Sequence, residues 1–262
     1  FIYFVFIIDI YNKLIMSNNF KKNLVYIHGF SANKDDHPLL LNKLKSENYQ
    51  FYNFDLPAHG SLKDKYNIDE VKFDMLVKYC VEKIKSFNLD SFILFGHSMG
   101  GAISTTIAGE KHFEKEMTGL ILEAPLNKKT VTRSVSSYRE ALNNIKHITK
   151  KNKLSEAIKD YFTSVKDSKK DYMSLLFNIL SRSSLLRIQD AITNIDVPTL
   201  LLTADCDVYI PCKDTAVNYS NYIDDLETHI IKGSGHCISI DQPKEFYKYF
   251  IGFLHYLEKR NG

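Results

Sequence analysis

Phe95-Gly96-His97-Ser98-Met99-Gly100-Gly101 is the stretch of this sequence that says most about its fold. It follows an apolar run that begins at residue 92 and precedes a helical pattern over residues 102–108. A serine flanked by glycines at two residues before and two after, between a strand and a helix, is typical of a nucleophile elbow. Both glycines are needed because such a tight turn leaves no room for a side chain. The start of the helix favours negative charge beside the serine. We therefore predict that Ser98 is a nucleophile.

Short apolar runs alternate with longer helical patterns on both sides of this turn. The runs are largely unalternated, which is typical of strands that helices cover on both faces. They lie at residues 24–27, 51–54, 92–95, 120–122, 199–202 and 228–231. Helical patterns cover residues 69–87, with Asp69 as the expected N-cap, and residues 244–257. The order predicts an α/β fold, with a mostly parallel sheet flanked by helices.

Residues 126–195 interrupt this alternation. They contain no convincing strand but several helical patterns, and a structureless loop of such length would be unusual. We therefore predict a helical insertion that divides the core into residues 16–125 and 196–262. Residues 1–15 are an apolar segment too short to span a membrane and without the flanks of a signal peptide. Met16 is the favoured natural start, while a buried first strand or a truncated leader are the alternatives for the segment before it.

The composition excludes several classes of protein. The 262 residues are 44% hydrophobic and 25% charged, which is incompatible with a disordered chain. Lys and Arg number 34 against 31 Asp and Glu, and no basic stripe is evident, so a nucleic-acid partner is not expected. The four cysteines form no C-x-x-C pair. Their sparse spacing fits a reducing compartment, and we expect a cytoplasmic protein.

The sequence resembles the α/β-hydrolase superfamily over nearly all of residues 24–257. His28-Gly29-Phe30 stands where that family places its oxyanion-hole loop. Residues 55–60, Asp-Leu-Pro-Ala-His-Gly, resemble its D-x-P-G-H-G segment, with Ala58 in place of the usual glycine. Carboxylesterases and monoacylglycerol lipases are the nearest subset. The resemblance implies that the insertion is a cap over the active site.

The oxyanion hole is expected from backbone groups rather than side chains. The resemblance points to the N–H groups of Phe30 and Met99, which would stabilise a tetrahedral intermediate. His28, His59 and His97 are expected to order the surrounding turns and not to act as bases.

A serine hydroxyl needs a base that an acid orients, and in this fold the acid and then the histidine follow the serine along the chain. His236 directly follows the last predicted strand, in Gly-Ser-Gly-His, and is the favoured base. His229 falls within a strand pattern and His255 within a helical pattern, so we expect both to be structural.

Two aspartates are candidates for the acid that orients the histidine. Asp205 and Asp207 both follow the buried strand at residues 199–202. In the α/β-hydrolase family that this sequence resembles, a small residue stands three positions before the acid. A proline stands four positions after the acid. Ala204, Asp207 and Pro211 match that register, which favours Asp207.

Neither a metal nor a cofactor is expected from the motifs. Cys206 and Cys212 are too far apart in sequence for a standard ligand pair, and Cys237 is adjacent to the predicted base. A histidine that bound metal there could not accept the serine proton.

These residues together predict a serine hydrolase that cleaves carboxylic esters through an acyl-enzyme on Ser98. The resemblance, not the spacing, implies a small acyl ester or acylglycerol as the substrate. A small-peptide aminopeptidase of the same fold is the alternative enzyme. A non-catalytic ligand-binding receptor is the alternative from another class, since fold and function are separable. Association of the cap with a membrane surface is a less favoured variant.

Overall fold

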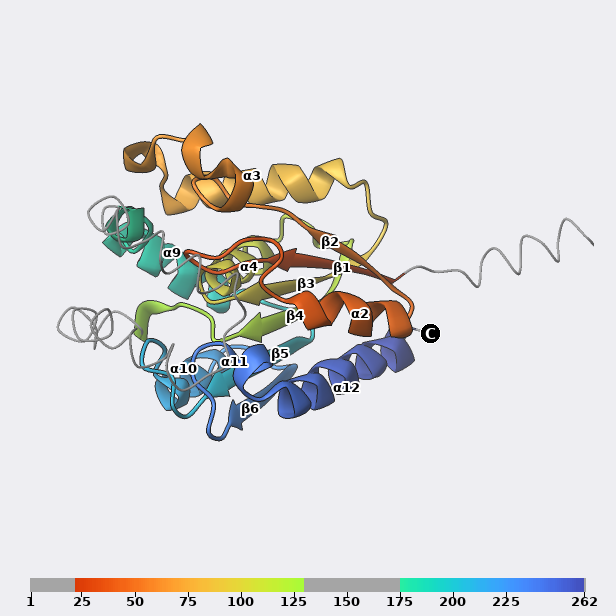
Figure 1. The fold of residues 1–262 in the computed structure, drawn as a ribbon. Coiled ribbons are helices and arrows are strands. Elements are labelled where there is room, and N and C mark those ends of the chain that lie inside the picture. The colour runs from red at the N-terminus through yellow and green to blue at the C-terminus, as the bar shows by residue number, and fades with distance from the viewer. Residues whose placement is uncertain (1–21, 130–174, 262) are drawn as a thin grey trace, which may run out of the picture.

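A parallel sheet of six strands lies at the centre of the protein (Figure 1). The computed structural model describes residues 22–129 and 175–261. The spatial order of the strands is β2-β1-β3-β4-β5-β6, and every neighbouring pair is parallel. Their bounds are β1 Lys22–Ile27, β2 Tyr49–Asn53, β3 Phe92–His97, β4 Met117–Glu123, β5 Thr199–Ala204 and β6 Leu226–Ile231. All six predicted strands are confirmed, and most are longer than the apolar runs that indicated them.

Helices cover both faces of this sheet. They are α2 Pro38–Ser46, α3 Phe73–Ser86, α4 Met99–Gly109, α9 Arg182–Ile192, α10 Cys212–Ser220, α11 Ile238–Asp241 and α12 Pro243–Asn261, with two 3-10 turns at Gly60–Lys65 and Ile68–Glu70. Apolar residues of α3, α4, α9 and α10 share one buried cluster. Those of α2, α11 and α12 share a second cluster across the sheet.

The strands supply alternate residues to these two clusters, because successive side chains of a strand point to opposite faces. The first cluster receives Val25, Ile27, Leu94, Leu120, Leu122 and Leu201. The second receives Leu24, Tyr26, Ile93, Phe95, Ile121, Leu200 and Leu202. Burial on both faces explains the unalternated apolar runs in the sequence.

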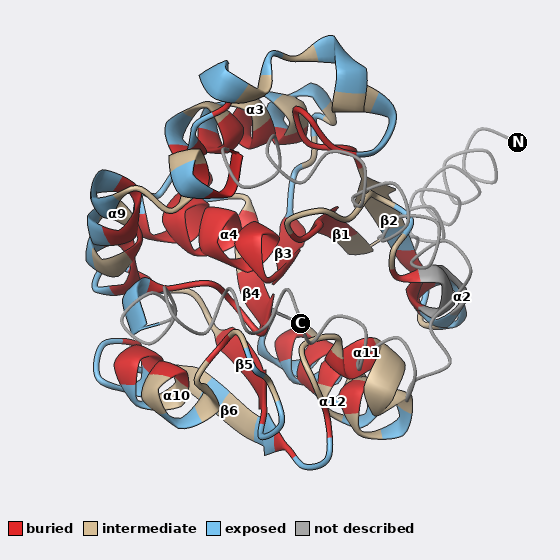
Figure 2. Ribbon diagram, turned by 60° about the vertical axis from the view of Figure 1, so that its left-hand side comes forward, coloured by how far each residue is buried: buried red, intermediate tan, exposed pale blue. Residues whose placement is uncertain are grey.

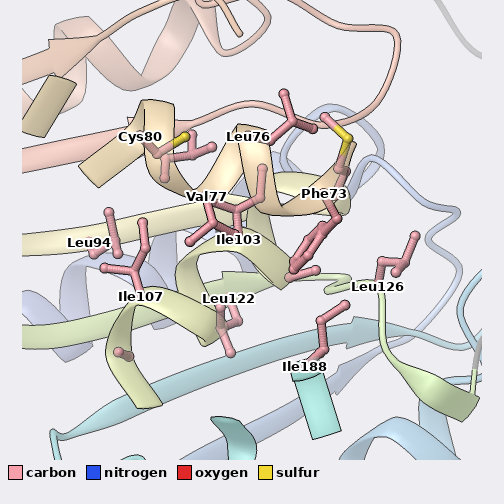
Figure 3. Packing of buried hydrophobic residues seen from close by; sticks show 14 of the residues in the cluster. Phe73, Leu76, Val77, Cys80, Leu94, Ile103, Ile107, Leu122, Leu126 and Ile188 are labelled. Atoms are coloured by element: carbon pink, nitrogen blue, oxygen red, sulfur yellow. The ribbon is translucent and has the colours of Figure 1, made fainter. Parts of the chain in front are cut away.

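Among the described helices, α4 is the most deeply buried (Figure 2). All eleven of its residues are buried. On its outer side Ile103 and Ile107 pack against α3, which contributes Phe73 and Val77 to the same cluster (Figure 3). The helix that follows the predicted nucleophile is therefore held firmly in the core.

The helix predicted over residues 69–87 begins later than expected, at Phe73. Asp69 is not its N-cap; it lies in the 3-10 turn Ile68–Glu70, where its backbone N–H donates to the Asn67 side chain. Val71 and Lys72 are extended, which lets the fully buried Val71 enter the core before the helix starts. The helix predicted over residues 244–257 is confirmed as α12.

Much of the predicted cap lies outside the described residues, as does the segment 1–15. The described part of the predicted insertion, residues 126–129 and 175–195, contains α9 and a helical stretch at residues 175–179. Within the described chain, no helix is long and apolar enough to cross a bilayer.

Arg187 joins α9 to α3 and to the end of α4. Its guanidinium donates to both oxygens of Glu110, at 2.6 and 2.8 Å, and to Asp74 at 2.7 Å. The hydrogen bonds from Arg187 hold the pKa of Glu110 below its usual range. A carboxyl group with a lowered pKa stabilises the fold above its unfolded pKa, and that stabilisation is lost as the pH falls through its folded pKa.

We expect Arg187→Met to lower the free energy of unfolding by about 1 kcal/mol at pH 7, because these side chains remain partly in water. The loss should shrink as the pH falls through the lowered folded-state pKa of Glu110, because below that pKa the carboxyl is protonated in both states. Urea unfolding at pH 7 and pH 3 measures both values. Lys78→Met, which removes only an exposed pair with Glu82, is the control and should change stability little at either pH. A loss for Arg187→Met that is equal at both pH values would contradict this account.

Candidate active site

Ser98 occupies the sharp turn between β3 and α4. Its backbone dihedrals, φ 54° and ψ −114°, are strained for a residue with a side chain. A Cβ atom at Gly96 would lie 2.4 Å from the carbonyl oxygen of Gly100, and one at Gly100 would lie 2.1 Å from that of Ile27. The two glycines are therefore required for the reason that the sequence predicted.

Gly100→Ala is expected to lower the free energy of unfolding by about 3 kcal/mol, because its methyl group would overlap the backbone of β1. Gly252→Ala in α12 is the matched control, since a Cβ there meets nothing within 4 Å. That control should stabilise the protein by about 0.5–1 kcal/mol through the helix propensity of alanine. Thermal or urea unfolding of the two variants measures the contrast, and a Gly100→Ala variant as stable as the wild type would refute the steric argument.

Ser98, His236 and Asp207 form a continuous hydrogen-bonded chain. Ser98 Oγ lies 2.8 Å from His236 Nε2, and His236 Nδ1 lies 2.8 Å from Asp207 Oδ2. The carboxylate of Asp207 accepts from Nδ1–H, which leaves Nε2 as the acceptor for the serine hydroxyl. The structure thus brings together the three residues singled out from the sequence, from the loops that follow β3, β5 and β6.

The immediate surroundings fix the carboxylate and favour the charged imidazole. Asp207 Oδ1 accepts from the backbone N–H groups of Tyr209 and Ile210, at 2.8 and 3.0 Å. Burial disfavours a charged His236, but the charge and hydrogen bond of Asp207 outweigh it, and Glu123 adds to the effect. The pKa of His236 is therefore raised above its ordinary value.

The side chain of Asp205 points away from the imidazole of His236 and contacts the Gly233 backbone. It is exposed, and its Oδ1 accepts from the backbone N–H of Gly233 at 2.7 Å. It therefore secures the loop that carries His236 without contacting the imidazole, while the neighbouring Asp207 reaches the ring.

The loop after β1 lies against the elbow. A Cβ atom at Gly29 would lie 3.2 Å from Ser98 Cβ, so the Phe30 amide and the first residue of α4, Met99, are both close to the serine. His28 orders this loop as predicted: its Nε2 accepts from the Leu56 N–H at 3.0 Å, and its Nδ1–H donates to the Gly29 carbonyl at 2.8 Å. The oxyanion-hole function of Phe30 and Met99 stays a prediction.

Asp55 ties the loops after β1 and β2 together. It accepts from the backbone N–H groups of Lys34 and Ser61, each at 2.9 Å. Ala58, which replaces the glycine of the resembled motif, takes a positive φ of 62°. The backbone shape that favours glycine is therefore kept here without one.

The sequence reasoning missed a buried polar layer on the α2 and α12 side of the triad. Glu123 is fully buried at the end of β4, and its Oε1 accepts from the Ser239 N–H at 2.9 Å. Asp36 and His37 approach it from the loop before α2. A charged residue directly after the apolar run 120–122 was the available signal. All four cysteines are free in the structure.

Comparison with known proteins shows the family of this chain. The sequence model of the family described as "Serine aminopeptidase, S33" matches residues 18–243, most of the chain. The chain belongs to this hydrolase family. It is 26% identical over 251 residues to "Putative esterase/lipase 2" of Mycoplasma genitalium, which covers 92% of each protein. It is also 24% identical over 254 residues to the Mycoplasma pneumoniae protein of the same name, which covers 92% of this chain and 91% of the relative.

Solved structures show how this family member folds. A "putative lipase" from Acinetobacter baumannii superposes with a TM-score of 0.73 at 20% identity, over 92% of this chain and 85% of that protein. An esterase from Exiguobacterium antarcticum superposes with a TM-score of 0.69 at 18% identity, over 89% and 92% of the two chains. The predicted α/β-hydrolase fold is confirmed.

Proposed function

We propose that this protein is a serine hydrolase that cleaves carboxylic esters, such as small acyl esters or acylglycerols, through an acyl-enzyme on Ser98. The hydrogen-bonded chain from Asp207 through His236 to Ser98 is the observation that carries the proposal. The esterase/lipase names of the two mycoplasma relatives support the substrate class.

Acylation begins when Ser98 Oγ attacks the ester carbonyl and His236 Nε2 takes its proton. The resulting oxyanion accepts hydrogen bonds from the N–H groups of Phe30 and Met99. When the intermediate collapses, the carbon–oxygen bond to the alcohol breaks, and His236 returns the proton to the departing alcohol. Asp207 keeps the imidazole in the required tautomer and stabilises its charged form.

Deacylation repeats these steps with water in place of the serine. His236 Nε2 takes a proton from water, which attacks the acyl carbonyl, and then returns that proton to Ser98 Oγ. The products are a carboxylic acid and an alcohol, and the enzyme is regenerated. The loops after β1 and β3 lie where the strand order reverses, between β1 and β3, which is the usual binding place of open α/β sheets.

A fluorophosphonate probe tests whether Ser98 is activated. The wild-type protein should form one covalent adduct, and peptide mass spectrometry should locate that adduct at Ser98. A His236→Ala variant should react far more slowly, because no base then takes the hydroxyl proton. A protein that is folded but unlabelled would instead support the non-catalytic receptor.

Paired substrates separate the ester hydrolase from the aminopeptidase that the family description favours. We expect turnover of p-nitrophenyl esters to exceed that of aminoacyl p-nitroanilides. The reverse preference would replace the ester proposal by the peptidase. A series of increasing acyl length then identifies the acyl group that the pocket prefers.

A further inference from the structure

We propose that Asp36, His37 and His97 form a binding site for one divalent transition-metal ion of the zinc class, in the buried layer next to the triad. Each residue offers one ligand atom, and these atoms all lie within 4.8 Å of one another. Two imidazoles and a carboxylate are a donor set that binds zinc or iron in proteins, with further positions left for water.

The fold places the three residues together from two separate segments. His97 ends β3 and lies on the same face of the sheet as Phe95, where the α2 and α12 cluster begins. His37 immediately precedes α2, and its ring packs on Tyr26 and Phe95 with ring centroids 4.9 and 5.4 Å apart. The positions of the donors are therefore set by the packed core.

Each of the three residues has an outer partner of the kind that orients metal ligands. His97 Nε2 lies 3.2 Å from the backbone carbonyl of His236, and His37 Nε2 faces Glu123 Oε2 at 3.4 Å. The Tyr26 hydroxyl donates to Asp36 Oδ1 at 2.8 Å. Metal-binding histidines commonly donate their second N–H to a carboxylate or a backbone carbonyl, as His97 Nε2 does here to the His236 carbonyl. This leaves His97 Nδ1 free to bind the ion, together with one ligand atom each from His37 and Asp36.

One buried nitrogen of this site has no hydrogen-bond partner among the described residues. His97 is only 7% exposed, and within the described part of the chain its Nδ1 makes no hydrogen bond. Buried polar atoms nearly always have a hydrogen-bond partner, because an atom without one loses its hydrogen bonds to water and gains none in the protein. Coordination to a metal would satisfy this lone pair.

The carboxyl groups around the site also suit a cation, because a bound ion would offset the cost of burying their charged forms. Two carboxyl groups, those of Asp36 and Glu123, lie in this layer, and among the described residues no Lys or Arg forms an ion pair with either. Imidazole donors favour zinc-class ions over Mg²⁺ and Ca²⁺, which prefer oxygen ligands.

Metal binding would have a structural consequence for the neighbouring site. The ion would join the loop after β1 to the end of β3, and through the His97–His236 contact it would reach the loop of the predicted base. Its role would be to hold these loops in place, and the ion would not contact the reacting ester.

Metal titration of the chelator-stripped, full-length protein tests the site without reference to activity. We expect one Zn²⁺ bound per chain by mass spectrometry of the metal, and a rise of about 5–10 °C in Tm at a hundredfold excess over Kd. Mg²⁺ should cause no such rise. Co²⁺ should bind with a visible spectrum of nitrogen and oxygen ligands, without the sulfur charge-transfer band that binding at Cys237 would produce.

Matched variants locate the ion. Asp36→Asn and His97→Gln should each weaken Zn²⁺ binding by about 100-fold or more. Asp35→Asn, which changes the exposed neighbouring carboxylate, and His112→Gln, at a partly exposed histidine elsewhere, should bind as the wild type does. The proposal is overturned by a wild-type protein that binds no stoichiometric metal, by a sulfur charge-transfer band, or by unchanged binding in Asp36→Asn and His97→Gln. If a variant fails to fold, the cobalt spectrum of the wild-type protein still tests the proposal, because a sulfur band would overturn it.

Discussion

Ser98→Ala is expected to lower kcat for a p-nitrophenyl ester by about 10⁶-fold, because no other group can form the acyl-enzyme. The rate that remains above the uncatalysed reaction should be about 10³-fold, and would come from the oxyanion donors acting on an attacking water molecule. Steady-state kinetics on protein shown to be folded by circular dichroism measures the loss. Ser220→Ala, at an exposed serine on α10, is the control and should leave kcat unchanged.

The double variant Ser98→Ala/His236→Ala sharpens this prediction. His236 acts by taking the Ser98 proton across a contact of 2.8 Å, so its removal should cost little once the hydroxyl is gone. We expect the residual rates of the single and double variants to agree within about threefold. If the two losses multiplied instead, Ser98 and His236 would be acting independently, and the acyl-enzyme mechanism would be wrong.

The parts of the fold that the sequence predicts are those that local chemistry dictates. Strand β4 can be predicted from the sequence because burial on both faces requires an uninterrupted apolar run. The elbow can be predicted because a Cβ atom at Gly96 or Gly100 would lie only 2.4 or 2.1 Å from a backbone oxygen, so only glycine fits there. His236 and Asp207 follow strands at the carboxyl edge of the sheet, so their position along the chain already implies that they lie near Ser98.

The features that could not be predicted from the sequence depend on contacts between segments far apart in the chain. The start of α3 is set by the burial of Val71, which no capping residue announces. The contact of His37 with Glu123 joins residues that are far apart in the sequence, and neither belongs to a recognisable motif. Such a layer forms only when β1, β3 and β4 stand side by side, so the sequence marks one member, the charged Glu123 after an apolar run, but not the residues that it meets.

Asp207→Asn is expected to lower kcat/KM by about 10⁴-fold, while the side chain keeps its size. An asparagine amide can donate to His236 Nδ1, which would favour the other imidazole tautomer, with its proton on Nε2. That nitrogen then can no longer accept the Ser98 proton, although the geometry is preserved. Steady-state kinetics with a p-nitrophenyl ester measures the effect, and an unchanged Tm shows that the fold is intact.

Asp205→Asn is the matched control, because the two aspartates lie in the same turn and differ in what they contact. Asp205 is exposed and accepts from the Gly233 N–H, whereas the side chain of Asp207 is fully buried against His236. An asparagine oxygen can still accept from Gly233, so Asp205→Asn should change kcat/KM by less than about tenfold. A greater loss from Asp205→Asn than from Asp207→Asn would show that the acid has been assigned to the wrong residue. The loop geometry argues against that outcome, because two backbone N–H groups hold the Asp207 carboxylate toward the imidazole before any substrate arrives.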